Sequence, residues 1–261
     1  MPQTLPIYQV DAFASEVFAG NPAAVCPLDA WLPDAVMQAI AMENNLSETA
    51  FIVKNGADYD LRWFTPALEV DLCGHATLGS AYVVATHLEP GRDEIVFHSK
   101  SGPLAVTRDA DLFTLDFPSL PPERLVDQGA VEAALGTALE ELWRADKNMA
   151  VLADEAAVLA ADPDLAKVAA LPGDGLIVTA PGRERDFVSR YFAPHAGIPE
   201  DPVTGSAHCV LTPYWTRRLD KARLSARQVS ARGGELVVED RGERVHISGR
   251  VAPYLEGRIR V

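Results

Sequence analysis

The pentapeptide RWFTP at residues 62–66 has a counterpart in RYFAP at residues 190–194, which lies 190 − 62 = 128 residues further along a chain of 261. The arginine, the second aromatic residue and the proline are identical, and an aromatic residue stands second in both copies. Each copy has a strand-like pattern followed by a loop and a largely apolar helical pattern, at 76–88 and 205–219. The offset therefore predicts duplication of one α+β unit, with a ligand cleft between the copies.

The rest of the chain fits two such units. An amphipathic helix is predicted over 32–42, where a proline stands in the first turn. Short strands bounded by turn residues are predicted at 6–13, 23–27, 49–53, 94–98, 104–106 and 112–117. The proline-rich segment 118–122 is interpreted as a linker. We therefore expect a first lobe at 1–117 and a second at 118–254, with a strand at about 255–261 returning to the first lobe.

Composition and charge exclude several classes of function. Lysine and arginine number 23 and aspartate and glutamate 37, so the net charge of −14 opposes binding to nucleic acid or to an anionic membrane. No leader-like start or apolar window of about 18 residues is present, and we expect a cytoplasmic protein. Three widely spaced cysteines, Cys26, Cys73 and Cys209, indicate reduced thiols.

Motifs for cofactors are missing from the sequence. It contains no dinucleotide or phosphate-binding glycine loop, no zinc-ligand spacing, and no nucleophile elbow around Ser80 or Ser206. We therefore expect chemistry from ordinary side chains, with no metal and no organic cofactor.

Glu48 is the leading acid/base candidate. It lies between the end of a predicted helix and the start of a predicted buried strand, where partial desolvation suits a carboxyl group to carry a proton. The alternative is a solvated glutamate in a turn. At the offset of 128, Glu48 falls on Leu176, so the second half has no acid in register.

Two helix starts could hold a small anion. Gly74-His75 and Gly205-Ser206 would expose backbone N–H groups at the positive ends of helix dipoles, although glycine at a helix start often only relieves a turn. Cys73 is either a thiolate at a helix start or a packed thiol. Asp201 is either the N-cap of the second helix or a partner that orients His75.

The remaining histidines have no organised neighbours in the sequence. We interpret them as structural or solvated: His87, His98, His195, His208 and His246.

Several motifs resemble those of the phenazine-biosynthesis PhzF-like proteins. These are VDAF at 10–13, FAGNPAAV at 18–25, ENNLSETAF at 43–51, RWFTPALEVDLCGHATLGSAY at 62–82, EDPVTGSAH at 200–208 and SARGGEL at 230–236. The resemblance implies an α+β fold like that of diaminopimelate epimerase, with two pseudo-symmetric lobes, each a curled, mostly antiparallel sheet around a central helix. It also implies a cofactor-independent isomerase that forms a homodimer.

The same motifs imply roles for individual residues. The glutamate of NLSETAF is Glu48, the proton-transferring acid/base, and His75 and Asp201 are the further catalytic residues. The residues expected to bind a small carboxylate substrate are Asn21, Gly74, Gly205, Ser206 and Gly233. The loop at 232–234 reads RGG, where phenazine-pathway members tend to have a GRP type of sequence. Because this loop would approach the substrate, the departure leaves open whether the substrate is that of the phenazine pathway, dihydro-3-hydroxyanthranilate.

Three functions compete at this point. The first is an isomerase that shifts a proton between carbons of a small carboxylate through Glu48. The second is a two-base epimerase or racemase, which needs bases on opposite faces of the reacting carbon. The resemblance implies a cysteine at each helix start for that reaction, whereas here the second start has no cysteine and Cys209 falls inside the helix. The third is a non-catalytic small-molecule-binding protein on the same fold.

Overall fold

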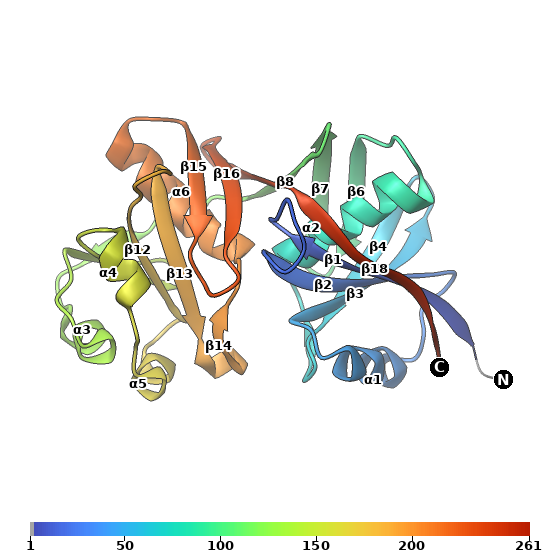
Figure 1. Ribbon diagram of the computed structural model, residues 1–261, viewed down its shortest axis with the longest axis horizontal. Helices are drawn as coiled ribbons and strands as arrows, with labels where there is room; N and C mark the ends of the chain where they lie inside the picture. The colour runs from blue at the N-terminus through green and yellow to red at the C-terminus, as the bar shows by residue number, and fades with distance from the viewer. Residues whose placement is uncertain (1–2) are drawn as a thin grey trace. The chain divides into compact units, whose positions relative to one another are not determined.

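The computed structural model describes residues 3–261, except for the side chain of Ala196. The chain forms two compact units, one that runs to Asp116 and includes Ser248–Val261, and one that comprises Phe117–Ile247 (Figure 1). The return to the first unit thus begins at Ser248, earlier than the predicted 255. No helix within 3–261 is long and apolar enough to cross a bilayer.

Strands dominate both units, as the α+β prediction requires. The first unit contains α1 (Asp34–Asn44), α2 (Gly74–Val83) with a π-helical turn (Val84–Leu88), and the strands β1 (Thr4–Ala12), β2 (Asn21–Leu28), β3 (Glu48–Asn55), β4 (Asp58–Phe64), β5 (Glu69–Val70), β6 (Glu94–Ser99), β7 (Gly102–Asp109), β8 (Leu112–Pro118) and β18 (Val251–Arg260). The second unit contains α3 (Gly129–Leu135), α4 (Glu155–Ala160), α5 (Leu165–Ala170), α6 (Gly205–Leu219), a 3-10 turn (Pro194–Ala196), and the strands β9 (Glu123–Leu125), β10 (Glu141–Arg144), β11 (Asn148–Val151), β12 (Leu176–Pro181), β13 (Phe187–Ala193), β14 (Ile198–Asp201), β15 (Arg223–Gln228), β16 (Gly234–Asp240) and β17 (Arg244–Gly249).

The two units repeat one topology. In the first, β2 pairs in parallel with β3, β3 is antiparallel to β4, and β4 pairs with β5 and, in parallel, with β6. In the second, β11, β12, β13, β14 and β15 are paired in the same order and with the same directions. A helix follows β5 in one unit and β14 in the other, so α2 and α6 occupy equivalent places in the chain.

In the first unit the sheet is covered on both faces. The helix α2 packs on one face and is buried almost all round, as its apolar sequence predicts. Gly79 permits this close contact, because a Cβ atom there would lie 2.7 Å from Cγ2 of Val10 on β1. The other face packs against α1 through Met37 and Ile40.

In the second unit, α6 takes the place of α2. Trp215 of α6 is fully buried and donates a hydrogen bond of 3.0 Å from its ring to Oγ1 of Thr179 on β12. The opposite face of β12 contributes Leu176 and Val178 to a core closed by α3, α4 and α5. Each unit therefore has a core helix on one face of its sheet and shorter or peripheral helices on the other (Figure 1).

An ion pair recurs with the repeat. Nε and Nη2 of Arg62 donate to the two carboxylate oxygens of Glu69 at 2.7 and 2.8 Å, and Arg190 binds Glu200 in the same way at 2.7 and 2.9 Å. Arg62 holds the pKa of Glu69 at about 2, well below its usual range. The sequence repeat identifies the two arginines as equivalent. It does not identify their acidic partners, because the segment between the arginine and its glutamate differs in length in the two units.

Candidate active site

Glu48 is the first residue of β3 and faces α2. The parallel register places it opposite Ala23 of β2, and Ala23 lies on the face that packs on Gly79 of α2. Only 12% of the Glu48 side chain is exposed. The predicted alternative of a solvated turn glutamate is therefore wrong.

Glu48, His75 and Cys73 form a compact cluster of three side chains. Nε2 of His75, in the first turn of α2, lies 3.1 Å from Oε2 of Glu48, and Nδ1 of the same ring lies 3.5 Å from Sγ of Cys73. The Glu48 Oε2 and His75 Nε2 atoms are sealed from solvent, yet the ring N–H is not aligned on the oxygen, so neither has a regular hydrogen bond within residues 3–261. Buried polar atoms left in this state are typical of functional sites.

Burial and neighbouring groups shift the pKa values of Cys73 and His75. Burial raises the pKa of the Cys73 thiol to about 11, and the Glu48 carboxylate adds to the increase. Burial opposes a charge on His75, but Cys73 and Glu48 together hold the pKa of its imidazole well above 6.5. With a pKa of about 11, the Cys73 thiol is uncharged at neutral pH. The thiolate interpretation of Cys73 is therefore disfavoured.

The same three residues offer atoms that metals bind. Their ligand atoms all lie within 4.8 Å of one another, and sulfur, imidazole nitrogen and carboxylate oxygen are the ligands of zinc. However, the two ring nitrogens face different neighbours, Nδ1 the sulfur and Nε2 the carboxylate. Because each ring nitrogen already faces one of the two neighbours, the cluster also has the geometry of a proton relay.

Two predicted substrate-binding residues lie in the same unit as Glu48. Asn21 begins β2 and is fully buried, and it shares the strand face of Ala23 because it stands two residues earlier. Gly74 is the first residue of α2, directly before His75. The structure thus groups Glu48 and His75 in contact, with Gly74 on the same helix as His75 and Asn21 on β2, the strand that pairs with β3.

The other predicted residues lie in the second unit, around the start of α6. Asp201 ends β14 and accepts a hydrogen bond from the Thr204 hydroxyl through Oδ2. Gln228 braces this loop, since its Oε1 accepts from the Thr204 N–H at 2.9 Å and its Nε2 donates to the Asp201 carbonyl at 2.7 Å. Thr204 is the N-cap residue, so the interpretation of Asp201 as the N-cap is wrong.

A second loop, which contains Ser230 and Gly233, is hydrogen-bonded to the turn that precedes α6. The Ser230 hydroxyl donates to the Pro202 carbonyl at 2.8 Å and accepts from the Gly233 N–H at 3.1 Å. Gly205 and Ser206 are the first two residues of α6, which begins and ends at the residues predicted. Gly233 therefore belongs to a loop held against the approach to that helix.

Strand register corrects the internal correspondence between the units. Thr49 pairs with Phe64, and Leu176 pairs with Phe192, which stands 128 residues after Phe64. The counterpart of Glu48 is therefore Gly175, one residue before the predicted Leu176. Likewise α2 begins at Gly74 and α6 at Gly205, so the counterpart of Cys73 is Thr204 and not Asp201. The second unit has neither a carboxylate nor a thiol at these places.

His208 of α6 is a buried neutral histidine. Its Nδ1 lies 2.8 Å from the Thr204 carbonyl, and burial lowers the pKa of its imidazole from 6.5 to about 4. The unfolded chain therefore binds a proton between pH 6.5 and 4 that the folded chain does not. Stability rises with pH across this window and is lost as the pH falls through it.

We expect this one side chain to remove up to about 3 kcal/mol of unfolding free energy between pH 6.5 and 4. Urea unfolding of the protein and of His208→Met at several pH values measures the effect, and at pH 7.5 the comparison gives the constant cost of the substitution. The variant should show a shallower loss over pH 6.5–4. Equal slopes would mean that His208 does not titrate as its burial implies.

Comparisons with known proteins agree with these observations. A family model described as phenazine biosynthesis-like protein matches residues 10–257. The chain belongs to the phenazine biosynthesis-like (PhzF) family. An uncharacterized isomerase of Pseudomonas aeruginosa is 52% identical over 255 residues, which cover 98% of this chain and 98% of that protein. The crystal structure of a PhzF family protein from Enterococcus faecalis superposes with a TM-score of 0.96 at 52% identity, and the match covers 98% of this chain and 99% of that one.

A more distant structure shares the fold alone. A hydroxyproline epimerase from Agrobacterium vitis matches 99% of this chain and 93% of its own with a TM-score of 0.64 at 9% identity. The predicted resemblance and the epimerase-like α+β fold are confirmed, and this member of the PhzF family is an isomerase.

Proposed function

We propose that this PhzF family member shifts a proton between two carbons of a small carboxylate, with Glu48 as the group that removes and returns it. The observation that carries the proposal is the sealed Oε2 atom of Glu48, 3.1 Å from Nε2 of a buried His75. A carboxylate held among buried groups keeps its basicity for a substrate C–H rather than for water.

The chain's own residues supply each step. Glu48 accepts the proton as the C–H bond breaks, and the electron pair of that bond moves into the conjugated system of the substrate. Protonated Glu48 then returns the proton to a second carbon, so atoms and charge balance without any co-reactant. The His75 imidazolium stabilises the carboxylate form of Glu48, and Cys73 contacts the far side of the His75 ring.

We assign the substrate carboxylate to the start of α2, where Gly74 directly precedes His75. Gly205 and Ser206, the first residues of α6, remain predicted substrate contacts. Backbone N–H groups at such ends attract anions. Asn21, Asp201 and Gly233 remain predicted substrate contacts, with Asp201 also a predicted catalytic residue.

A two-base epimerase is less well supported. That reaction needs a second base on the opposite side of the reacting carbon, whereas the second unit carries Gly175 and Thr204 where the first carries Glu48 and Cys73. A buried carboxylate beside a buried imidazole favours a catalytic role over a purely binding one, because ionisable groups in such surroundings cluster at active sites.

Proton exchange in heavy water tests the proposal. The protein is incubated with a panel of small unsaturated, hydroxy and amino carboxylates, and deuterium uptake is followed by proton NMR. We expect uptake at carbon in a product whose double bond has moved. Inversion of one stereocentre without a moved bond would assign the epimerase, and a bound carboxylate that never exchanges would leave only a binding role.

A further inference from the structure

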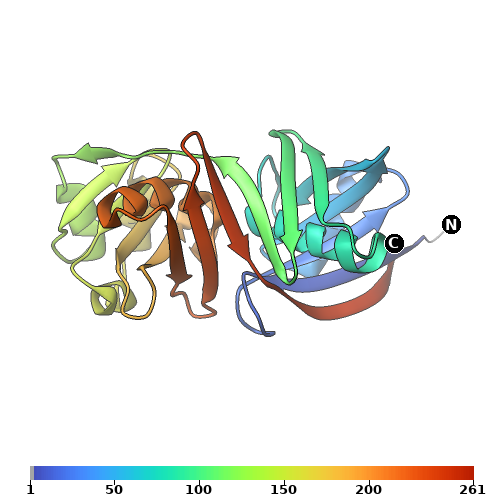
Figure 2. The same ribbon diagram turned by 90° about the horizontal axis from the view of Figure 1, so that it is seen from above.

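Cys73, His75 and Glu48 bring a sulfur, a nitrogen and an oxygen atom together at the start of α2. Figure 2 shows this helix (teal) among the strands of the first unit, and it packs against β1, β2, β3 and β18. The side chains of Cys73 and His75 are buried, and that of Glu48 is largely so. Within residues 3–261, Oε2 of Glu48 and Nε2 of His75 have no regular hydrogen bond. A ligand that engaged this cluster would therefore break none at these two atoms.

The spacing of the three ligand atoms fits a zinc ion. Zinc bonds of about 2.3 Å to sulfur and about 2.0–2.2 Å to nitrogen or oxygen place two ligands of a tetrahedral ion about 3.4–3.6 Å apart. Sγ of Cys73 lies 3.5 Å from Nδ1 of His75, which is the separation that zinc requires of this pair. The ligand atoms of all three residues lie within 4.8 Å of one another. The Glu48 carboxylate therefore has to approach by roughly 1 Å, which rotation of its side chain provides.

The charges of the cluster also favour a divalent cation. A thiol that binds zinc does so as the thiolate, and its proton passes to solvent. The Cys73 thiolate and the Glu48 carboxylate then carry two negative charges, which Zn²⁺ neutralises, so no unpaired ion is left buried. The positive end of the α2 dipole opposes the cation with only a partial charge. Sulfur and imidazole nitrogen select zinc over magnesium or calcium, which prefer oxygen ligands.

We propose that Cys73, His75 and Glu48 form a zinc-binding site at which the ion inhibits the enzyme. Sγ, Nδ1 and one carboxylate oxygen form bonds to zinc, the thiol proton and some of the ion's water molecules are released, and nothing is oxidised or reduced. A remaining water molecule takes the fourth position, as in other zinc sites with three protein ligands. The binding site follows from the geometry alone. The inhibition rests on the proposed function, because zinc occupies the carboxylate oxygen that would accept the substrate proton.

Cobalt(II) is the probe for the thiolate ligand, because cobalt–thiolate bonds give a charge-transfer band in the near ultraviolet. We expect this band, at one ion per chain, when the chelator-treated protein is titrated with Co²⁺, and we expect Zn²⁺ to abolish it. Cys73→Ser should lose the band, whereas the control Cys209→Ser, which alters a buried thiol of α6, should keep it. No band in the unaltered protein, or a band that persists in Cys73→Ser, would overturn the site.

Calorimetric titration with Zn²⁺ tests the other ligands without any substrate. Cys73→Ser and Glu48→Gln should each raise the zinc dissociation constant by at least about a hundredfold, because loss of a ligand costs more than the tenfold to hundredfold typical of groups around the ligands. Circular dichroism of each variant confirms that it is folded. Unchanged affinity in both folded variants would contradict the proposal.

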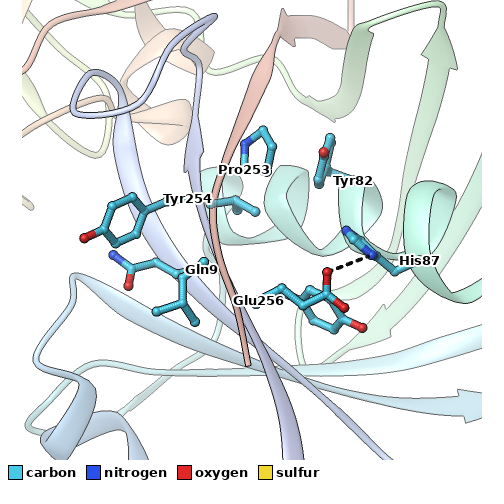
Figure 3. Close-up of a pocket in the computed structure, with 9 residues that line it drawn as sticks. Gln9, Tyr82, His87, Pro253, Tyr254 and Glu256 are labelled. Carbon is cyan, nitrogen blue, oxygen red and sulfur yellow. Dashed lines mark ion pairs between the residues drawn. The ribbon is translucent and has the colours of Figure 1, made fainter. Parts of the chain in front are cut away.

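Two histidine–carboxylate pairs on the surface of the same unit serve as control sites. His87 lies 3.9 Å from the Glu256 carboxylate beside a small hollow (Figure 3), and His98 lies 2.9 Å from that of Asp58. Neither pair includes a cysteine. The double variant H87Q/H98Q should keep the zinc affinity of the cluster within about twofold, since distant sites act independently. Zinc binding that depends on these histidines and not on Cys73 would show adventitious binding only.

The heavy-water exchange assay measures the inhibition. Saturating Zn²⁺ should lower the exchange rate by about 10²–10⁴-fold, as expected for loss of a general base, and a chelator should restore it. Cys73→Ser should remain active at the same zinc concentration. Full exchange in zinc-loaded protein would refute the inhibition and remove Glu48 from the mechanism, with the metal site intact. Absence of the cobalt band refutes the site whatever the activity, so the two failures are distinguishable.

Discussion

Glu48→Gln should lower turnover by about 10²–10⁴-fold or more, with the dissociation constant of the bound carboxylate changed by no more than a few-fold. The amide keeps the shape of the side chain and a hydrogen-bonding oxygen beside His75, but it cannot accept a proton from carbon. Steady-state kinetics and calorimetric binding on the same preparation measure the two effects separately. Retained turnover would remove Glu48 from the mechanism.

Cys73→Ser is the matched control because it changes the other neighbour of the His75 ring. Its thiol is uncharged at neutral pH, with a pKa of about 11, so we expect a loss of less than about tenfold, well below that of a general base. The opposite ranking of the two variants would indicate a thiol base and revive the two-base epimerase. Both variants retain a polar group of similar size, so the comparison is not one of packing.

The sequence predicted the core of each unit because the strongest signals are local. The apolar run after Thr204 and the glycine at its start were sufficient to locate α6 from Gly205 to Leu219. Glu48 was found at the start of a buried strand for a similar reason, since a polar residue at the border of an apolar run is conspicuous. Its contact with His75 depends on the packing of α2 on the sheet, which no local pattern encodes.

The sequence prediction placed the counterpart of Glu48 one residue too late in the second half of the chain, and this error changes the strand face on which the counterpart lies. Corresponding residues of β4 and β13 are 128 positions apart, whereas those of the preceding strands, β3 and β12, are 127 positions apart. Glu48 therefore corresponds to Gly175 and not to Leu176. A shift of one residue in a strand moves a side chain to the opposite face. Leu176 belongs to the core closed by α3, α4 and α5, and it says nothing about the face that Glu48 occupies.

Gly175→Ala should reduce the free energy of unfolding by about 3–5 kcal/mol, from backbone strain and overpacking together. Gly175 has φ +125°, and a Cβ there would lie 2.5 Å from the Phe192 carbonyl oxygen and 3.0 Å from the Tyr191 hydroxyl. That hydroxyl donates to the Asp174 carbonyl, so the ring has little freedom to withdraw. Urea unfolding followed by circular dichroism measures the loss.

Gly242→Ala is the control that separates strain from contact. Gly242 also has a positive φ, +81°, but a Cβ there meets nothing within 4 Å, so we expect a loss of only about 1–2 kcal/mol. If the two variants lose equal stability, the close contact at Gly175 adds nothing to the cost of its backbone conformation. If Gly175→Ala loses far more, even a methyl group is excluded there, and a glutamate at Glu48's counterpart is excluded more strongly. The backbone of the second unit would then itself exclude a carboxylate base at the position that corresponds to Glu48.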